Sequence, residues 1–307
     1  MKKIFILLVA LLTAITFSAC GADNYEKSRK IKVVTTIFPV YDWTCEIIGG
    51  DEKNFDLTLL MDKGVDLHSF QPSAQDIMKI STCDVLICVG GESDEWISDA
   101  LNRSTNKNLV VVKLLDVLGD KLKHETHDGE LEIDEHIWLS LTNAQILCEA
   151  ITDALIKTDF VTPDTLKKNS AAYKEKLSAL DKKYRDTLTD AQGKTLLFGD
   201  RFPFRYLVDD YGLKYFAAFA GCSAESEASF QTIKFLADKV DELNLPCVMT
   251  IDGSDKKIAE TIIANSMSKP QKILTLDSMQ GKVDGATYLS AMEKNLEVLR
   301  EALEVGR

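Results

Sequence analysis

The feature that most constrains the fold of this sequence is one uninterrupted helical pattern near its middle. Thr162-Pro163-Asp164 places an N-cap residue before a proline at the first helical position and an acid in the first turn. The apolar positions then recur at helical spacing as far as Gly193, and they are Leu166, Tyr173, Leu177, Leu180, Tyr184 and Leu188. A helix of this length spans about 40 Å. It predicts a stiff connector rather than a flexible hinge, and no large closure of the parts that it joins.

Short apolar strands alternate with amphipathic helices on both sides of this connector. The expected strands are 32–36, 55–60, 85–89 and 109–114 in the first half, and 195–199, 215–218, 248–252 and 272–276 in the second. Such alternation implies right-handed βαβ units and mainly parallel sheets. We therefore predict an α/β protein of two lobes, each a mainly parallel sheet with flanking helices, joined by one long rigid helix. The N-terminal lobe is expected over 32–160, the linking helix over 161–192 and the C-terminal lobe over 193–307.

The N-terminus has the features of an export signal. Met1-Lys2-Lys3 is a short positive stretch, and Ile4 to Phe17 is an apolar run of signal-peptide length. The run ends in Phe17-Ser18-Ala19-Cys20-Gly21, which resembles a bacterial lipobox with Phe17 where leucine is common. We expect a signal peptide over 1–20, lipid attachment at Cys20 and a tether over 21–31. The protein would then be extracytoplasmic and anchored to the bacterial cell membrane as a lipoprotein. The alternative is ordinary cleavage that leaves Cys20 free.

The composition is that of a globular protein with an acidic surface. Hydrophobic residues make up 45% of the chain and charged residues 27%, which argues against disorder. The formal charge is −12, and losing the two positive charges of Lys2 and Lys3 with the signal takes it to −14. This balance disfavours nucleic acid as a partner and suits a cationic ligand.

The seven cysteines do not form a structural zinc ribbon, because none of them stands in a C-x2-C pair. Most of those after Cys20 lie in apolar runs such as Asp84 to Val89, where cysteine packs as a small buried hydrophobe. We expect buried thiols, with one or more disulfides as the alternative in an extracytoplasmic protein.

Two of the four histidines stand where folds of this class place ligands. His68 lies between an expected strand and a helix that Ser73 and Asp76 begin with a capping box. His136 enters the helix that closes the first lobe. Imidazole is a common ligand for zinc and related ions, although a lone histidine is more often a satisfied polar residue. The segment 121–134, which holds His124 and His127 among acids, is expected to be a solvated loop, with weak metal scavenging as the alternative.

The chain contains, in this order, the segments Gly64 to Ser73, Asp134 to Leu139 and Gly221 to Ser229. They resemble segments of the zinc and manganese solute-binding proteins of bacterial ABC transporters, the cluster A-I family. Gly64 to Ser73 is similar to the family's first motif, with Leu67 where proline is usual. Asp134 to Leu139 resembles the second motif, and Gly221 to Ser229 resembles a segment of the second lobe. The match covers nearly everything after the tether. It implies a monomer that holds an ion between two lobes and delivers it to a transporter permease.

In that family one histidine from each first-lobe motif and two residues from the second lobe hold the metal. The resemblance carries the first two roles over to His68 and His136. It places Asp252, at the end of the expected strand 248–252, at the fourth position. Residues 277–280 follow the last strand and receive no ligand role.

The third position of the family falls on Arg201, whose guanidinium is always protonated and has no lone pair to offer. Asp200, one residue earlier, becomes the expected third ligand after a small loop shift. Glu225 and water are the alternatives. If Arg201 instead pairs with Glu225 or Asp252, the site loses an acid and binds metal more weakly.

Two imidazoles with one or two carboxylates form a site that suits zinc, manganese or iron(II) rather than copper(I). The short acid-rich segment before His136 resembles the longer loop of zinc-specific relatives and favours zinc. Two rival functions stay open. One is an adhesin or organic-ligand binder of the same fold that has lost metal. The other, a metallohydrolase, is disfavoured because the sequence contains no H-E-x-x-H, G-x-S-x-G or P-loop motif, so we expect no enzyme activity.

Overall fold

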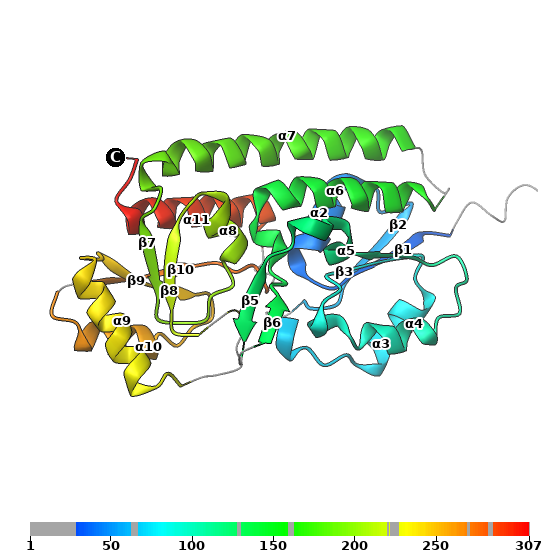
Figure 1. The fold of residues 1–307 in the computed structure, drawn as a ribbon. Helices are drawn as coiled ribbons and strands as arrows, with labels where there is room; N and C mark the ends of the chain where they lie inside the picture. Colours follow the sequence, from blue (N-terminus) through cyan, green and yellow to red (C-terminus); the bar gives the residue numbers. More distant parts are fainter. Residues whose placement is uncertain are drawn as a thin grey trace, which may run out of the picture.

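The computed structural model describes residues 29–62, 67–127, 130–158, 163–219, 221, 227–268, 271–281 and 285–306. Two α/β lobes lie side by side, and one long helix crosses over both of them (Figure 1). The expected signal peptide, Cys20 and most of the expected tether lie outside the described residues. Within the described part, no helix is both long and apolar enough to cross a membrane.

The first lobe is built on a parallel four-stranded sheet of order β2-β1-β3-β4. Its strands are β1 (Ile31–Thr35), β2 (Phe55–Leu59), β3 (Val85–Cys88) and β4 (Val110–Lys113). Its helices are α2 (Phe38–Ile48), α3 (Ala74–Thr82), α4 (Ile97–Asn102), α5 (Leu114–Leu118) and α6 (Leu141–Ile156). Ser73 and Asp76 form the predicted capping box at the start of α3. The helix therefore begins directly after the segment that carries His68.

The second lobe repeats this layout with a parallel sheet of order β10-β9-β7-β8. Its strands are β7 (Thr195–Phe198), β8 (Lys214–Ala217), β9 (Cys247–Ile251) and β10 (Lys272–Leu276). Its helices are α8 (Arg205–Asp210), α9 (Phe230–Glu242), α10 (Lys257–Asn265) and α11 (Tyr288–Leu303). In each lobe the first strand lies between the second and the third, and the fourth lies beyond the third. The prediction of two similar parallel α/β lobes is confirmed.

The long helix α7 (Pro163–Leu188) confirms the helical pattern read from the sequence. All six residues of the predicted apolar stripe are buried. They pack against α2 and α6 of the first lobe and α11 of the second. The hydroxyl of Tyr184 donates to the backbone oxygen of Met292 in α11 at 2.6 Å. One hydrophobic core therefore runs under α7 through both lobes, which supports a stiff spine.

The segment 121–134 was expected to be a loop, and this expectation is wrong because most of the segment is a β-hairpin. β5 (His124–His127) and β6 (Glu130–Ile133) pair as its two antiparallel strands. Asp128-Gly129, which joins the two strands in the sequence, is one of the commonest dipeptides of two-residue hairpin turns. The acidic composition of the segment concealed this signal.

The cysteines that the structure describes are not joined in disulfides. Cys83, Cys88, Cys148 and Cys247 are buried. Burial raises the pKa of the Cys83 and Cys247 thiols to about 12, so they stay protonated and pack as apolar groups. The prediction of buried thiols is confirmed for these four. Cys222 lies outside the described residues.

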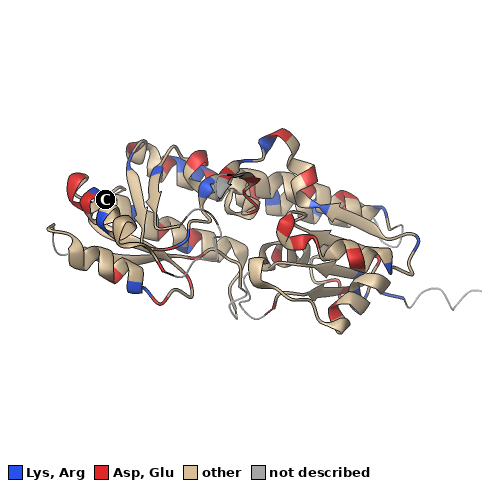
Figure 2. Cartoon of the chain, turned by 60° about the horizontal axis from the view of Figure 1, so that its bottom comes forward, with Lys and Arg blue, Asp and Glu red and all other residues tan. Residues whose placement is uncertain are grey.

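Acidic and basic residues are interspersed along the chain in both lobes (Figure 2). One acid, Asp241 near the end of α9, has a structural role. Its carboxylate accepts hydrogen bonds from the backbone of Met267 and Ser268 and from the hydroxyl of Ser266, at 2.6 to 3.1 Å. These bonds, the backbone bond from Met267 foremost, hold the pKa of Asp241 well below its usual range.

We therefore expect Asp241→Asn to lower the thermal midpoint at pH 7. A carboxylate whose pKa is depressed by folding contributes stability above its unfolded pKa of about 4. That contribution is lost as the pH falls through the lower folded pKa, so the midpoints of variant and wild type should converge in acid. Asp238→Asn is the control, because Asp238 lies on the same helix and forms an exposed ion pair with Lys234. Calorimetric scans of the three proteins from pH 7 to pH 2 test this, and equal midpoints for the two variants at pH 7 would contradict it.

Candidate metal centre

The structure brings two of the predicted ligands, His68 and His136, together. His68 lies in a single 3-10 turn (Leu67–Ser69) between β2 and α3 and is exposed. His136 directly precedes a second 3-10 turn (Ile137–Leu139) and is fully buried. The centroids of the two rings are 5.5 Å apart. At a zinc–nitrogen distance of about 2.0–2.1 Å, rings this close can share one ion after a small adjustment.

In each of these histidines the ring nitrogen Nδ1 has a hydrogen-bond partner. Nδ1 of His68 lies 2.7 Å from the hydroxyl of Ser93. Nδ1 of His136 lies 2.8 Å from Oδ1 of Asp134, which also accepts the backbone N–H of His136 at 2.8 Å. A carboxylate only accepts, so in a neutral ring the proton of His136 sits on Nδ1 and the lone pair on Nε2. A carboxylate behind a histidine is the arrangement that orients ring ligands in metal sites.

Three buried acids lie behind the histidines, and they are Asp94, Asp134 and Glu135. Oε1 of Glu135 accepts the backbone N–H of Ser93 at 3.1 Å, and Oδ2 of Asp94 accepts that of Gly90 at 2.9 Å. Burial raises the pKa of Asp94 to about 6, and the neighbouring Glu135 adds to the shift. Burial also raises the pKa of Glu135.

The second oxygen of each acid is buried without a hydrogen bond within the described part of the chain. Negative charge concentrated in this way stabilises a cation bound in front of the rings. Gly91 makes room for the arrangement, because a Cβ there would lie 1.9 Å from Oε1 of Glu135.

The predicted ligands of the second lobe lie at the carboxyl ends of its strands. Asp200 follows β7, and its carboxylate accepts the backbone N–H of Arg201 at 2.9 Å and that of Ile251 at 3.4 Å. Asp252 follows β9, and its Oδ1 accepts both the N–H and the hydroxyl of Ser278 at 2.7 Å. Among the described residues, no three His, Cys, Asp or Glu side chains are grouped closely enough to hold an ion. The structure thus pairs the two histidines but does not add Asp200 or Asp252 to them. Glu225 lies outside the described residues.

The loop after β10 supplies contacts that sequence reasoning missed. Nε2 of the Gln280 amide, buried at 8% exposure, lies 3.4 Å from Nε2 of His136. The indole of Trp138 donates to the backbone oxygen of Ser278 at 2.8 Å. Burial raises the pKa of Asp277, and the charge of Asp252 at the end of the neighbouring strand adds to this. The sequence could have predicted these contacts from the position of the loop after β10, because the ends of adjacent parallel strands such as β9 and β10 meet at one edge of a sheet.

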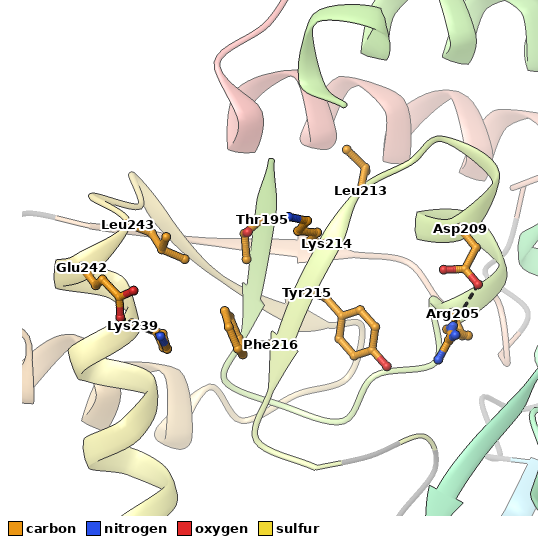
Figure 3. A pocket seen from close by; sticks show the side chains of 10 residues that line it. All are labelled: Thr195, Arg205, Asp209, Leu213, Lys214, Tyr215, Phe216, Lys239, Glu242 and Leu243. Atoms are coloured by element: carbon orange, nitrogen blue, oxygen red, sulfur yellow. Dashed lines mark hydrogen bonds and ion pairs between the residues drawn. The ribbon is translucent and has the colours of Figure 1, made fainter. Parts of the chain in front are cut away.

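A groove of about 510 Å³ lies elsewhere, along the edge strand β8 between α8 and α9 (Figure 3). Its cations are largely paired: Arg205 with Asp209 at 2.9 Å and Lys239 with Glu242 at 2.6 Å. No histidine or cysteine lines it. The candidate metal centre is therefore the histidine pair and not this groove.

Comparison with known proteins shows which family the chain is related to. The family model described as zinc-uptake complex component A, periplasmic (ZnuA), matches residues 33–302. The zinc-binding lipoprotein AdcA of Streptococcus pneumoniae serotype 4 is 32% identical over 315 residues, which cover 99% of this chain and 62% of that protein. The high-affinity zinc uptake system protein ZnuA of Bacillus subtilis is 30% identical over 304 residues, which cover 94% of each chain. The chain thus spans less than two thirds of the AdcA length and nearly all of that ZnuA.

Solved structures show the same fold. The Zn(II)-bound ZnuA-like domain of Streptococcus pneumoniae AdcA superposes with a TM-score of 0.72 at 29% identity, covering 90% of this chain and 100% of that domain. The laminin-binding protein Lmb of Streptococcus agalactiae, described as a bifunctional protein with adhesin and metal transporting activity, gives 0.76 at 27% identity, covering 90% and 100%. Because the family model matches most of the chain and a relative is 30% identical over 94% of both chains, this chain belongs to the ZnuA family of zinc and manganese solute-binding proteins.

Proposed function

We propose that this chain captures a zinc ion between its two lobes and delivers it to the permease of an ABC transporter. The observation that carries the proposal is the histidine pair. His68 and His136 lie with ring centroids 5.5 Å apart, and each has its Nδ1 hydrogen-bonded. Both Nε2 atoms are therefore the natural ligand atoms, and three buried acids behind them favour a cation.

The remaining ligands are proposed to come from the second lobe. Asp252 offers its Oδ2 to an ion, because the two hydrogen bonds from Ser278 both go to Oδ1. The side-chain amide of Gln280 already lies next to His136. A half-turn of this amide places its oxygen, an uncharged metal ligand, where the nitrogen now lies. Asp200 needs the loop after β7 to move, since both of its oxygens accept backbone hydrogen bonds.

This donor set favours zinc. Imidazole nitrogen suits zinc well, and at a given site zinc binds more tightly than manganese in the usual affinity order. The curated relatives described above are named for zinc. Manganese is proposed as a weaker alternative cargo.

The surroundings of the protein are proposed from its sequence and its relatives. We place it outside the cytoplasm, anchored to the membrane through a lipid on Cys20, because the sequence around Cys20 resembles a lipobox and the relative AdcA is described as a lipoprotein. We propose a monomer that binds its cargo without catalysing a reaction. The net charge of −12 argues against nucleic acid as a partner.

Calorimetric titration of the chelator-treated protein tests the proposal. One zinc ion per chain should bind at pH 7.5 and raise the thermal midpoint, and manganese should bind more weakly. Zinc affinity should fall as the pH is lowered to 5, because imidazole takes up a proton near pH 6.5 and a protonated ring has no lone pair for the metal. No heat and no thermal shift with either ion would contradict metal capture. An affinity that stays constant from pH 7.5 to 5 would exclude the histidines as ligands.

A further inference from the structure

At the open end of the β5–β6 hairpin in the first lobe, a hydroxyl group from the second lobe takes part in the hydrogen bonding between the two backbones. In the register of β5 and β6, where His124 faces Ile133, the next pair is Lys123 and Asp134. The N–H of Asp134 donates to the oxygen of Lys123 at 2.9 Å, as an antiparallel pair requires. The reciprocal bond, from the N–H of Lys123 to the oxygen of Asp134, is replaced by two hydrogen bonds through a hydroxyl group. The N–H of Lys123 donates to the hydroxyl of Tyr206 at 3.0 Å, and that hydroxyl donates to the oxygen of Asp134 at 2.9 Å.

Tyr206 belongs to α8, which contacts the first lobe at two further places. Asp209 forms an ion pair with Lys123 at 3.0 Å. It also pairs with Arg205, as Figure 3 shows. The hydroxyl of Ser140, the N-cap of α6, donates to Asp210 at 2.6 Å. These contacts hold both ends of the segment 123–140, and His136 lies within it.

We propose that Tyr206 is a positioning residue for His136, acting through Asp134. The hydroxyl of Tyr206 bridges the N–H of Lys123 and the backbone oxygen of Asp134 and so sets the distance between these two backbones. The carboxylate of Asp134 in turn orients the ring of His136. Without the hydroxyl, the N–H of Lys123 and the oxygen of Asp134 face each other unpaired. Leaving buried polar groups unpaired is unfavourable, so the pair closes by a direct bond and moves Asp134 relative to the ring. The inference deepens the proposed function, since it makes the second lobe set the position of a first-lobe ligand.

Tyr206→Phe removes this hydroxyl alone, and Tyr211→Phe is its matched control. Tyr211 directly follows α8 and is also buried, but its hydroxyl donates to Asp181 of α7 at 2.9 Å. We expect Tyr206→Phe to weaken zinc binding about 10-fold, at the lower end of the effect of groups that orient metal ligands. Tyr211→Phe should leave zinc affinity close to that of the wild type. The visible absorption of bound Co²⁺, which reports ligand geometry, should change only in Tyr206→Phe. Equal affinities and equal Co²⁺ spectra for the two variants would overturn the proposal.

A double-mutant cycle with Asp134→Asn separates positioning from general loss of structure. If Tyr206 acts through Asp134, most of the effect of Tyr206→Phe disappears once Asp134 is already changed. Additive effects would overturn the proposal.

NMR of the metal-free protein distinguishes this proposal from the metal-binding one. The ring nitrogen resonances of His136 should shift in Tyr206→Phe and not in Tyr211→Phe, whether or not the wild type binds zinc. If Tyr206→Phe does not fold, the wild type provides the test: its Tyr206 hydroxyl proton should show contacts to the Lys123 amide and shift when zinc is added. A hydroxyl resonance unmoved by bound zinc would overturn the proposal, whereas a wild type that binds no zinc overturns the proposed function.

Discussion

Replacing His136 by alanine is expected to weaken zinc binding by at least about 100-fold. Zinc sites with four protein ligands bind with roughly 10–16 kcal/mol, so one ligand accounts for about 3 kcal/mol or slightly more, which is a factor of more than 100. His136 is fully buried, and its removal leaves the carboxylate of Asp134 without the ring that it orients. His68→Ala is expected to have a similar effect, because it removes the other member of the pair.

His124→Ala is the control for both variants. His124 lies on β5 and is exposed, close in sequence to His136 but absent from the histidine pair. We expect its zinc affinity to equal that of the wild type. Isothermal titration with a competing chelator gives the affinities, and circular dichroism of the metal-free proteins checks that each variant is folded. If His124→Ala weakens binding as much as His136→Ala does, the ion is bound at the hairpin rather than at the pair.

Much of the fold could be predicted because its signals are local. The apolar stripe of α7 is a pattern within one segment, and each of its members is buried as expected. The eight strands of the two parallel sheets were each located to within about one residue, because buried parallel strands are continuous apolar runs. The hairpin was missed because β5 carries only polar residues and the alternation of polar and apolar residues in β6 is confined to four positions within an acidic segment.

The site could be predicted only in part, because its contacts join segments far apart in the chain. The histidines were found from their motifs. Their partners Ser93 and Gln280 lie 25 and 144 residues away, and nothing local marks either residue. Asp200 and Asp252 were correctly expected at strand ends. Where their side chains point depends on Ile251 and Ser278, which no pattern in the sequence connects to them.

The shared core beneath α7 gives the second large expected effect. Tyr288, at the start of α11 in the second lobe, is fully buried against the first lobe. Its ring meets that of Trp43 edge-on at a centroid distance of 5.1 Å, and its hydroxyl donates to the backbone oxygen of Trp138 at 2.7 Å. Tyr288→Ala should lower the free energy of unfolding by about 3–5 kcal/mol, the usual cost of truncating a buried aromatic residue. Tyr288→Phe keeps the ring and removes one hydrogen bond, so it should cost only about 1–2 kcal/mol.

The tryptophans allow this prediction to test whether the lobes unfold together. All three, Trp43, Trp96 and Trp138, lie in the first lobe, so tryptophan fluorescence reports that lobe while far-ultraviolet circular dichroism reports both. In guanidinium chloride, Tyr288→Ala should shift the two transitions equally, because a single core is lost in one cooperative step. A fluorescence transition that stays at the wild-type midpoint would mean that the lobes unfold separately. In that case α7 would be a linker between independent domains, and the second lobe could not hold His136 in place through the rigid contacts of α8.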